Sequence, residues 1–272
     1  SLYKATIKQY FYFPMYVLII ISALATSILS GLVGMAGGVV LMAVLVNILP
    51  VSSAMVLHGI TQFTANGSRT LILRKHLMWR LLPGYILGAG VAIAGFSTLL
   101  FVPDASVVLI LVGLFPWLAR LQPKSSAFNI TRPASNIICG VSVTSAQLLA
   151  GAAGPLLDLF YLNSGLDRQT VVANKALTQT IGHLLRIFYY GAIISVATPL
   201  PNWLFLAAAI AAVAGTRLGT WLLVRWDDQR FQRVGGSENV NVDLRVISST
   251  SRDLNQEIAE KNFREELFHR LN

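Results

Sequence analysis

Two glycine clusters lie inside long apolar runs, where a membrane helix ordinarily carries leucine. The first is 31-GLVGMAGG-38 and the second is 148-LLAGAAGP-155. Glycine lets a helix break, and the freed N–H groups must bind protein, water or ligand, because lipid offers no hydrogen bonds. The amino-terminal end of a half-helix is partly positive and binds anions, so two such ends predict a site for a small anion. The glycines expected there are Gly34, Gly37, Gly38, Gly151 and Gly154.

Polar side chains follow each glycine cluster inside the next apolar segment. Their spacings of three, four and seven residues place them along one helical face, and polar groups within a membrane usually face a cavity or pathway. We expect Gln62 and Gln179, near the helix centres, to contact the anion, and Arg69 and Arg186 to attract it from a vestibule. The candidates are His58, Thr61, Gln62, Asn66 and Arg69 in the first segment and Thr178, Gln179, His183 and Arg186 in the second.

Each candidate also has a purely structural interpretation. The glycines can be small contacts that let helices pack closely, the glutamines and threonines can join helices by hydrogen bonds, and the arginines can snorkel to the interface. The two histidines can couple transport to a proton or another ion, or remain neutral and hydrogen-bonded. Asp158 is the acid well inside an apolar run, and we expect it to pair with Lys175 or Arg186 rather than relay a proton.

The two polar sets align when the sequence is compared with itself at an offset of 117 residues. This pattern predicts two repeats, about 14–119 and 131–225, each with a broken helix, as in secondary transporters. The repeats are parallel or inverted according to whether each broken segment crosses the membrane or turns back. The matched pairs are Gly34 with Gly151, Gly37 with Gly154, Thr61 with Thr178, Gln62 with Gln179, and Arg69 with Arg186.

The composition is that of an integral membrane protein, since 54% of the 272 residues are hydrophobic and only 12% are charged. We therefore expect an all-α polytopic fold with about seven hydrophobic helices in the lipid bilayer, each long enough to span. The net charge of +9 lies mainly in short loops, so it indicates topology and no nucleic-acid partner. The apolar segments begin near Pro14, Ser53, Leu81, Ala105, Ala134, Val171 and Trp203, and all end before Arg225.

The most basic connections are 74-RKHLMWR-80 and the loop with Arg120, Lys124 and Arg132. The positive-inside rule places both in the cytoplasm, which is consistent because two spans separate them. If the first segment crosses the membrane once, the amino terminus is also cytoplasmic and Arg225 lies outside.

Residues 14–231 resemble the TauE/SafE family of sulfite and organosulfonate transporters. The resemblance lies in 31-GLVGMAGGVVLMAVL-45, 74-RKHLMWRLLPG-84, 88-GAGVAIAG-95, 151-GAAGPLLDLFYL-162 and 215-GTRLGTWLLVRWDDQRF-231. It implies two repeats of about four helices and transport of a small sulfur-containing anion across the cytoplasmic membrane of a bacterium. The alternatives are an anion channel or a transport-impaired relative. The sequence has no H-E-x-x-H motif, no paired carboxylates and one cysteine, so we expect no enzyme, metal or cofactor site.

The sequence changes character after Phe231, where a charged, soluble tail begins. We assign residues 1–230 to the membrane domain and 231–272 to a fragment that is not an independent domain. The segments 242-VDLRVISSTSRDL-254 and 263-FREELFHRLN-272 resemble part of the AAA+ domain of sigma-54-dependent activators. No phosphate-binding loop precedes them, so nucleotide binding is not expected. We expect an amphipathic helix over about 252–271, where the family resemblance would place another membrane helix.

Overall fold

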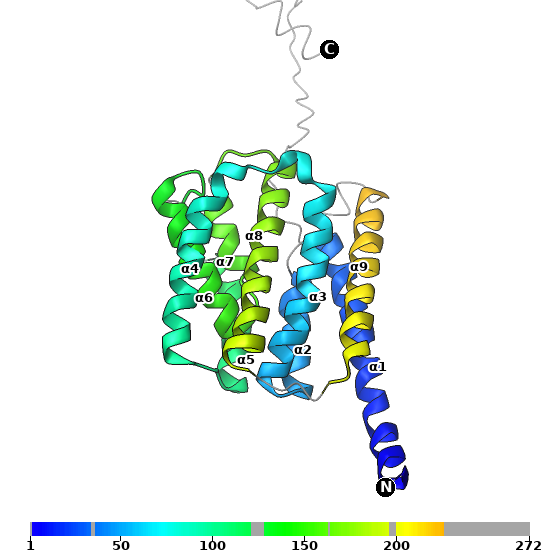
Figure 1. Cartoon of the computed structure of the whole chain (residues 1–272). Coiled ribbons are helices and arrows are strands. Elements are labelled where there is room, and N and C mark those ends of the chain that lie inside the picture. Colours follow the sequence, from blue (N-terminus) through cyan, green and yellow to red (C-terminus); the bar gives the residue numbers. More distant parts are fainter. Residues whose placement is uncertain (1, 34–35, 121–127, 163, 196–199, 226–272) are drawn as a thin grey trace, which may run out of the picture. The chain divides into compact units, whose positions relative to one another are not determined.

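The computed structural model describes residues 2–33, 36–120, 128–162, 164–195 and 200–225, all within one compact unit. In these ranges all regular structure is helical, as predicted (Figure 1). The seven apolar segments correspond to nine α-helices among the described residues, because the first and fifth segments are each split at their glycine cluster. Gly34, Lys124 and the tail after residue 225, with its expected helix, lie outside the described residues.

The first four α-helices of each repeat follow the same order, and the first repeat has α5 in addition. The first contains α1 (Leu2–Val33), α2 (Ala36–Ile48), α3 (Val51–Ile72), the short turns η1 (Arg74–His76) and η2 (Trp79–Leu81), α4 (Leu82–Leu99) and α5 (Ala105–Arg120). The second contains α6 (Pro133–Ala150), α7 (Gly154–Tyr161), α8 (Arg168–Phe188), the π-turn η3 (Tyr189–Ile193) and α9 (Asn202–Arg225).

Local sequence explains where several of these helices begin. Proline occupies the first turn of α4, α6 and α7, where its missing N–H costs no helical hydrogen bond. Pro155 therefore starts a half-helix, as the sequence predicts. Asp167 caps α8, because its carboxylate accepts the Thr170 N–H at 3.0 Å.

The broken helix of the first repeat turns back on itself. α2 packs against the last turns of α1, and a Cβ added to Gly37 would overlap the carbonyl oxygen of Thr26 and the hydroxyl of Ser30. Only glycine allows the two backbones to approach this closely. For Gly37, the close-packing interpretation therefore describes the geometry.

The broken helix of the second repeat also turns back. α6 ends at Gly151, whose φ of +72° is the left-handed conformation that favours glycine, and α7 starts three residues later. The N–H of Ile130, just before α6, donates to the carbonyl oxygen of Phe160 near the end of α7 at 2.9 Å. The start of α6 and the end of α7 therefore lie at the same end of the protein.

The α1–α2 hairpin and the α6–α7 hairpin enter the protein from opposite ends, so the repeats are inverted. α3 and α8 lie side by side and antiparallel, with Gly59 beside Ile187 and Gly67 beside Thr180. Because α2 leads directly into α3 and α7 leads into α8, each hairpin opens at the end where its own following helix begins (Figure 1). Inverted repeats with broken helices at a shared centre are characteristic of secondary transporters.

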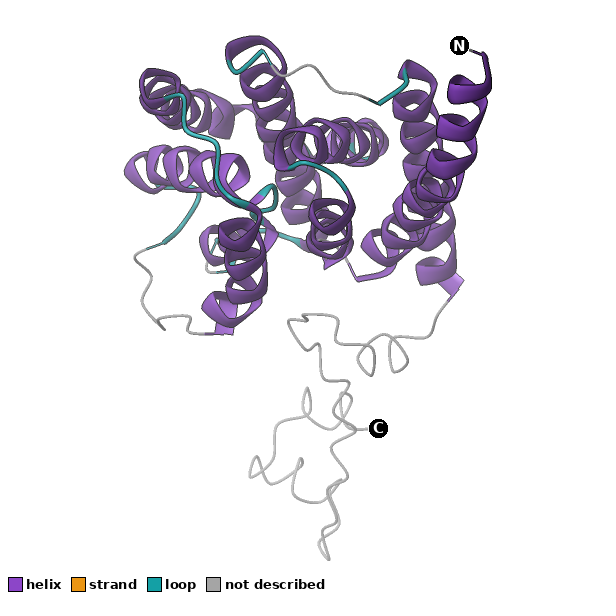
Figure 2. Ribbon diagram, turned by 90° about the horizontal axis from the view of Figure 1, so that it is seen from below, coloured by secondary structure: helices purple, strands orange, loops and turns teal. Residues whose placement is uncertain are grey.

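Two further pairs of helices pack across the repeats, α1 with α9 and α4 with α6, and each pair is parallel with small residues at its contact. α9 runs beside α1 in the same direction. The rings of Tyr16 and Trp203 lie 5.5 Å apart, and further along both helices Gly31 packs against Gly219. α4 follows α6 in the same way, with Gly140 packed against the backbone of Tyr85. The two pairs are exchanged by the offset that relates the repeats. Figure 2 shows the described residues as helices joined by loops, seen from below.

The sequence left open whether the first segment crosses the membrane once or turns back, and the structure shows that the chain reverses between α1 and α2. The start of α1 therefore lies at the end opposite the basic turns η1 and η2 (Figure 1). α9 runs parallel to α1, which brings Arg225 to the basic end. The amino terminus therefore lies opposite the basic turns, and Arg225 lies at the same end as they do, contrary to the two expectations from a single crossing. The basic carboxyl end of α9 agrees with the positive-inside rule.

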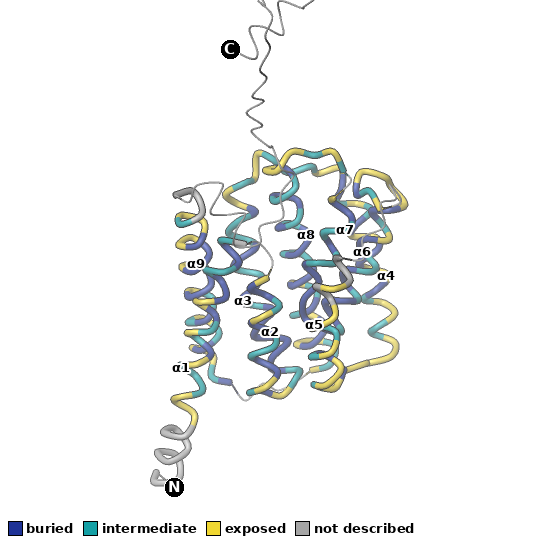
Figure 3. The backbone as a smooth tube through the Cα atoms, turned by 180° about the vertical axis from the view of Figure 1, so that it is seen from behind, coloured by how far each residue is buried: buried dark blue, intermediate teal, exposed yellow. Residues whose placement is uncertain are grey.

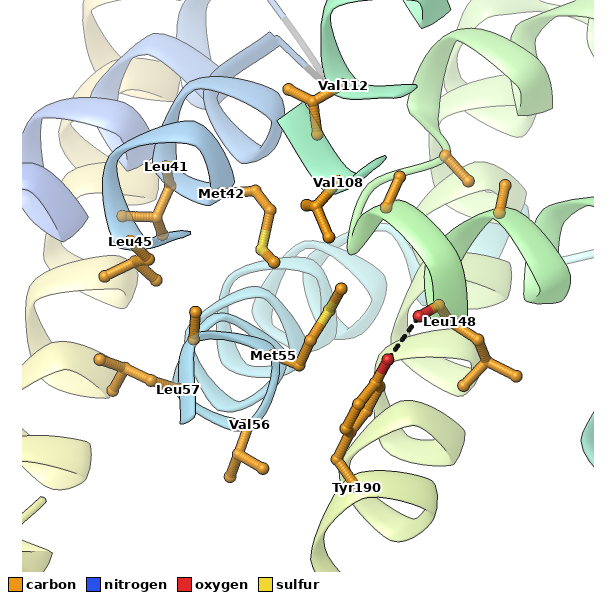
Figure 4. Close-up of a cluster of buried hydrophobic side chains, with 14 of the residues drawn as sticks. Leu41, Met42, Leu45, Met55, Val56, Leu57, Val108, Val112, Leu148 and Tyr190 are labelled. Carbon is orange, nitrogen blue, oxygen red and sulfur yellow. Dashed lines mark hydrogen bonds between the residues drawn. The ribbon is translucent and has the colours of Figure 1, made fainter. Parts of the chain in front are cut away.

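Figure 3 shows which parts of each helix are buried and which are exposed. The buried residues are both apolar and polar, and many large apolar side chains are exposed. Among the described residues, three helices are long and apolar enough to span a bilayer: Tyr12–Leu32, Trp79–Leu99 and Asn202–Leu222. Buried side chains from α2, α3 and α5 form an apolar layer around Leu41, Met42, Leu45, Met55 and Val108 (Figure 4). Exposed apolar side chains outside and buried polar side chains inside are the arrangement expected in lipid.

Candidate functional site

A cavity of about 20 Å³ lies where the two hairpins meet α3 and α8. This volume has room for at least one water molecule. Seven of the fourteen candidate residues line it: Gly38, His58, Gln62, Asn66, Gly154, Gln179 and His183. The other lining residues are Ser30, Ala152 and Ala153.

The amino-terminal turns of both half-helices border this cavity. Gly38 lies in the first turn of α2, and Gly154 is the first residue of α7. The first N–H groups of a helix have no acceptor within the helix and carry its partial positive charge. Two positive helix ends from opposite repeats therefore face one small polar space.

Gln62 contributes an unpartnered hydrogen-bond donor to the cavity. Its side chain is 4% exposed, and Nε2 has no hydrogen-bond partner. The Gln62 amide lies against Gly38, since a Cβ added there would be 3.3 Å from Oε1. A buried amide donor without a partner is costly, so this group favours a ligand or an ordered water that can accept a hydrogen bond.

A series of hydrogen bonds next to the cavity joins the α1–α2 and α6–α7 hairpins. The fully buried guanidinium of Arg186 donates to the carbonyl oxygen of Gly151 and to Nδ1 of His58, the latter at 2.6 Å. Nε2 of His58 lies 2.7 Å from the carbonyl oxygen of Gly38. Because a guanidinium only donates hydrogen bonds, Nδ1 of His58 accepts one from Arg186. Nε2 therefore carries the ring proton and donates a hydrogen bond to the carbonyl oxygen of Gly38. His58 is thus a neutral bridge between Arg186 and the first hairpin.

The charge of Arg186 has no carboxylate partner among the residues that the structure describes. In the described ranges the ion pair is that of Lys175 with Asp158, which confirms the expected pairing of Asp158, and no carboxylate pairs with Arg186. Its Nε atom is also without a partner. Buried charges are normally paired. The guanidinium of Arg186 contacts His58, which lines the cavity, so its unpaired positive charge favours an anion in the cavity.

The histidines differ in their free hydrogen-bonding capacity. The rings of His58 and His183 lie 5.8 Å apart between ring centroids. Both nitrogens of His58 have partners, whereas Nδ1 of His183 is buried without one. Of the two residues considered for coupling to a proton, His183 is the one with a free ring nitrogen at the cavity.

The remaining candidates that the structure describes are not part of the cavity wall. Thr61 donates to the carbonyl oxygen of Leu57 at 2.8 Å, and Thr178 donates to that of Asn174 at 3.0 Å, so both hydroxyls serve their own helices. Arg69 donates to the carbonyl oxygen of Ser30 at 3.0 Å, near the end of α1. Each arginine thus bonds the last turns of the broken helix in its own repeat, which the expectation of a vestibule did not include.

Sequence reasoning missed three residues of the wall. Ser30 aligns with Gln147 at the repeat offset, so no repeated residue type marked it. Ala152 and Ala153 lie within the second glycine cluster but have no polar side chain. They line the cavity because the chain changes direction between α6 and α7. No group of three or more His, Cys, Asp or Glu residues is placed to hold a metal ion in the part of the chain that the structure describes.

Two protein families match the chain. The family described as "Sulfite exporter TauE/SafE" matches residues 18–237, and the "Sigma-54 interaction domain" matches residues 208–272. Similar curated proteins include the nitrogen assimilation regulatory protein NtrX of Azorhizobium caulinodans, 59% identical over 44 residues, and the DNA-binding transcriptional regulator NtrC of Escherichia coli K12, 53% identical over 45 residues. These alignments cover 16% of this chain and 10% of each relative.

No solved structure matches the chain. The match to the transporter family covers most of the sequence and contains every element of both repeats except the first turns of α1. The match to the regulators is confined to the carboxyl-terminal part, as the resemblance of the tail predicts. The chain therefore belongs to the sulfite exporter TauE/SafE family of membrane transporters.

Proposed function

We propose that this protein is a secondary transporter that carries a small sulfur-containing anion, such as sulfite or a sulfonate, through the cavity between its inverted repeats. The observation that supports this most strongly is the convergence of two half-helix amino termini, the free amide of Gln62 and the unbalanced charge of Arg186. Each of these features favours negative charge, and none of the ten lining residues is acidic.

The position of the cavity favours a carrier over an anion channel. Both repeats contribute to its wall, so movement of one repeat against the other would change its size and its access to either side. Movement of one repeat against the other around a fixed site is the usual mechanism of transporters with inverted repeats. A channel would instead need a continuous path that the anion crosses without this rearrangement.

Counterflow in proteoliposomes tests the proposal. Vesicles loaded with unlabelled sulfite should accumulate labelled sulfite from outside, with saturable kinetics and with inhibition by competing sulfonates. Flux that never saturates and shows no counterflow would identify a channel. Saturable binding without flux would identify a transport-impaired relative, and the absence of both binding and flux would overturn the proposal.

We also propose that the protein resides in the cytoplasmic membrane of a bacterium, with the basic end toward the cytoplasm. The exposed side chains of Arg74, Lys75, Arg80, Arg132 and Arg168 lie at that end. For the tail we propose no nucleotide-binding role, because the sequence contains no phosphate-binding loop. An ATP-dependent change in thermal stability would contradict that view.

A further inference from the structure

The ion pair between Asp158 on α7 and Lys175 on α8 lies one helical turn from the cavity. Asp158 follows the cavity residue Gly154 by four positions, and Lys175 precedes the cavity residue Gln179 by four. Four residues make about one turn of helix, so both charges lie directly between the cavity and the basic end. They join the two helices that border the cavity on that side.

The ion pair is more accessible than the cavity wall behind it. The side chains of Lys175 and Asp158 are 20% and 37% exposed, whereas Gln179 and His183 are 7% and 3% exposed. An anion that moves along α7 and α8 from the basic end passes Lys175 before it reaches Gln179.

The other side of the cavity is closed differently. At the repeat offset, Leu41 and His58 occupy the positions of Asp158 and Lys175. Leu41 belongs to the buried apolar layer in Figure 4, and His58 is held by Arg186 and Gly38. Within the described ranges, the two repeats thus differ at these positions: an ion pair lies on one side of the cavity, and packed apolar side chains lie on the other.

We propose that Lys175 is a relay site for the transported anion between the basic end and the cavity. The inference rests on the proposed function and adds a second anion position to it. The arriving anion replaces the Asp158 carboxylate as the partner of the Lys175 ammonium, which offers three donors to either oxyanion. The ammonium stays paired throughout, and the contact between α7 and α8 is released.

Two physical features make this exchange feasible. An arriving oxyanion replaces the carboxylate with an equivalent acceptor, so the Lys175 ammonium is not left as an unpaired buried charge. The exposed basic side chains of Arg74, Lys75, Arg80, Arg132 and Arg168 also raise the local concentration of anions at this end.

A cysteine in the cavity wall can report access through this pair. Ala153→Cys is introduced together with Cys139→Ala, and the protein is placed in nanodiscs so that both faces meet the reagent. Modification is followed with two methanethiosulfonate reagents of similar size, one carrying a sulfonate and one a trimethylammonium group. The sulfonate reagent serves as the anionic probe, so the measurement needs no transport.

Asp158→Asn should accelerate modification by the sulfonate reagent on the order of tenfold, as expected for electrostatic focusing of an anion by the freed Lys175, and should accelerate the cationic reagent much less. Asp158→Asn combined with Lys175→Met should accelerate both reagents equally. Asp167→Asn is the matched control, because it removes a carboxylate at the same end while keeping a capping side chain. It should leave both rates unchanged.

The outcomes separate this inference from the proposed function. Unchanged rates in Asp158→Asn, or equal acceleration of both reagents in that single variant, would overturn the relay. Size-exclusion profiles and thermal unfolding of each variant show whether the fold is retained. Failure of the unmodified protein to bind sulfite would count against the proposed substrate, while the charge-selective modification rates would still decide the role of Lys175.

Discussion

Arg186 and His58 connect the two repeats, with the guanidinium Nη2 of Arg186 2.6 Å from Nδ1 of His58. The residues are 128 positions apart in sequence and belong to α8 and α3. Through this contact, one cation on the second repeat holds Gly151 directly and Gly38 through the imidazole. The two helix breaks are thus positioned by a shared group, and a shift of either repeat must alter the same hydrogen-bonded chain.

The side-chain donor of Gln62 predicts a specific loss of affinity. Gln62→Leu should weaken anion binding about 10- to 100-fold, the value of a hydrogen bond to a charged group. Its effect on unfolding should be small, because Nε2 of Gln62 has no protein partner. Titration with labelled sulfite measures the affinity, and thermal unfolding measures the stability.

Gln147→Leu is the matched control for that substitution. Gln147 is 1% exposed and both its side-chain polar atoms lack partners, but it does not line the cavity. Sulfite affinity should remain at the level of the unmodified protein. If Gln147→Leu weakened binding as much as Gln62→Leu, the assignment of Gln62 to the site would be lost.

The first hairpin predicts a sharp difference between two glycines. Gly37→Ala would place a methyl group into the Thr26 carbonyl, so α1 and α2 would have to separate and the protein should lose thermal stability and transport. Gly90→Ala, on α4, meets no atom within 4 Å and should be neutral or slightly stabilising, since alanine favours helix. Thermal unfolding of both variants tests the close approach; equal melting temperatures would contradict it.

The cap of α8 predicts a pH-dependent contribution to stability. The hydroxyl and N–H of Thr170 lower the pKa of Asp167 below its ordinary value of 3.8. A lowered folded-state pKa means that the contribution is present above the unfolded-state value and is lost as pH falls through the folded-state pKa. Asp167→Ala should lower the melting temperature at neutral pH, and Asp167→Asn should lower it less, because asparagine also caps helices.

The difference between Asp167→Ala and the unmodified protein should shrink as the pH falls below about 3.8, the ordinary pKa of the carboxyl group. Melting curves over an acidic pH series measure this convergence. A difference that stayed constant across the series would show that the carboxylate charge contributes nothing to the cap.

The inverted hairpins predict the sidedness of the chain. A tag at the amino terminus of this sequence and a tag inserted beside His76 should lie on opposite sides of the membrane, because α1 and α2 turn back (Figure 1). Protease protection in sealed vesicles distinguishes the two sides. Protection of both tags, or of neither, would show that the first segment crosses the membrane.

Much of the fold follows from the sequence because chain length and apolar content are strong constraints in lipid. A helix over 14–46 would be about 50 Å long, beyond a hydrocarbon core of about 30 Å, so the glycine cluster had to interrupt it. The repeat offset then locates the second interruption. The direction of each hairpin does not follow, since a crossing segment and a returning segment have the same composition.

The site is less accessible to sequence reasoning than the fold. The polar spacing on α3 and α8 identifies Gln62, Asn66, Gln179 and His183, all of which border the cavity. It cannot separate them from Thr61 and Thr178, which lie on the same helices but bond to their own backbones. The partners of Arg186 depend on contacts between distant segments, which helical periodicity does not encode.

Arg186 carries the central claim that uncompensated positive charge at the cavity binds the anion. Arg186→Met keeps a side chain of considerable length while removing the charge and its hydrogen bonds to Gly151 and His58. Arg69→Met is the control, since Arg69 occupies the equivalent position in the first repeat but bonds Ser30 and does not contact His58.

Equilibrium binding of labelled sulfite in nanodiscs provides the most direct measurement. The unmodified protein should show one saturable site per chain, Arg69→Met should retain most of the affinity, and Arg186→Met should weaken binding by on the order of 100-fold, or about 2.7 kcal/mol. Equal affinity in Arg186→Met and the unmodified protein, or no saturable binding by the unmodified protein, would contradict the account.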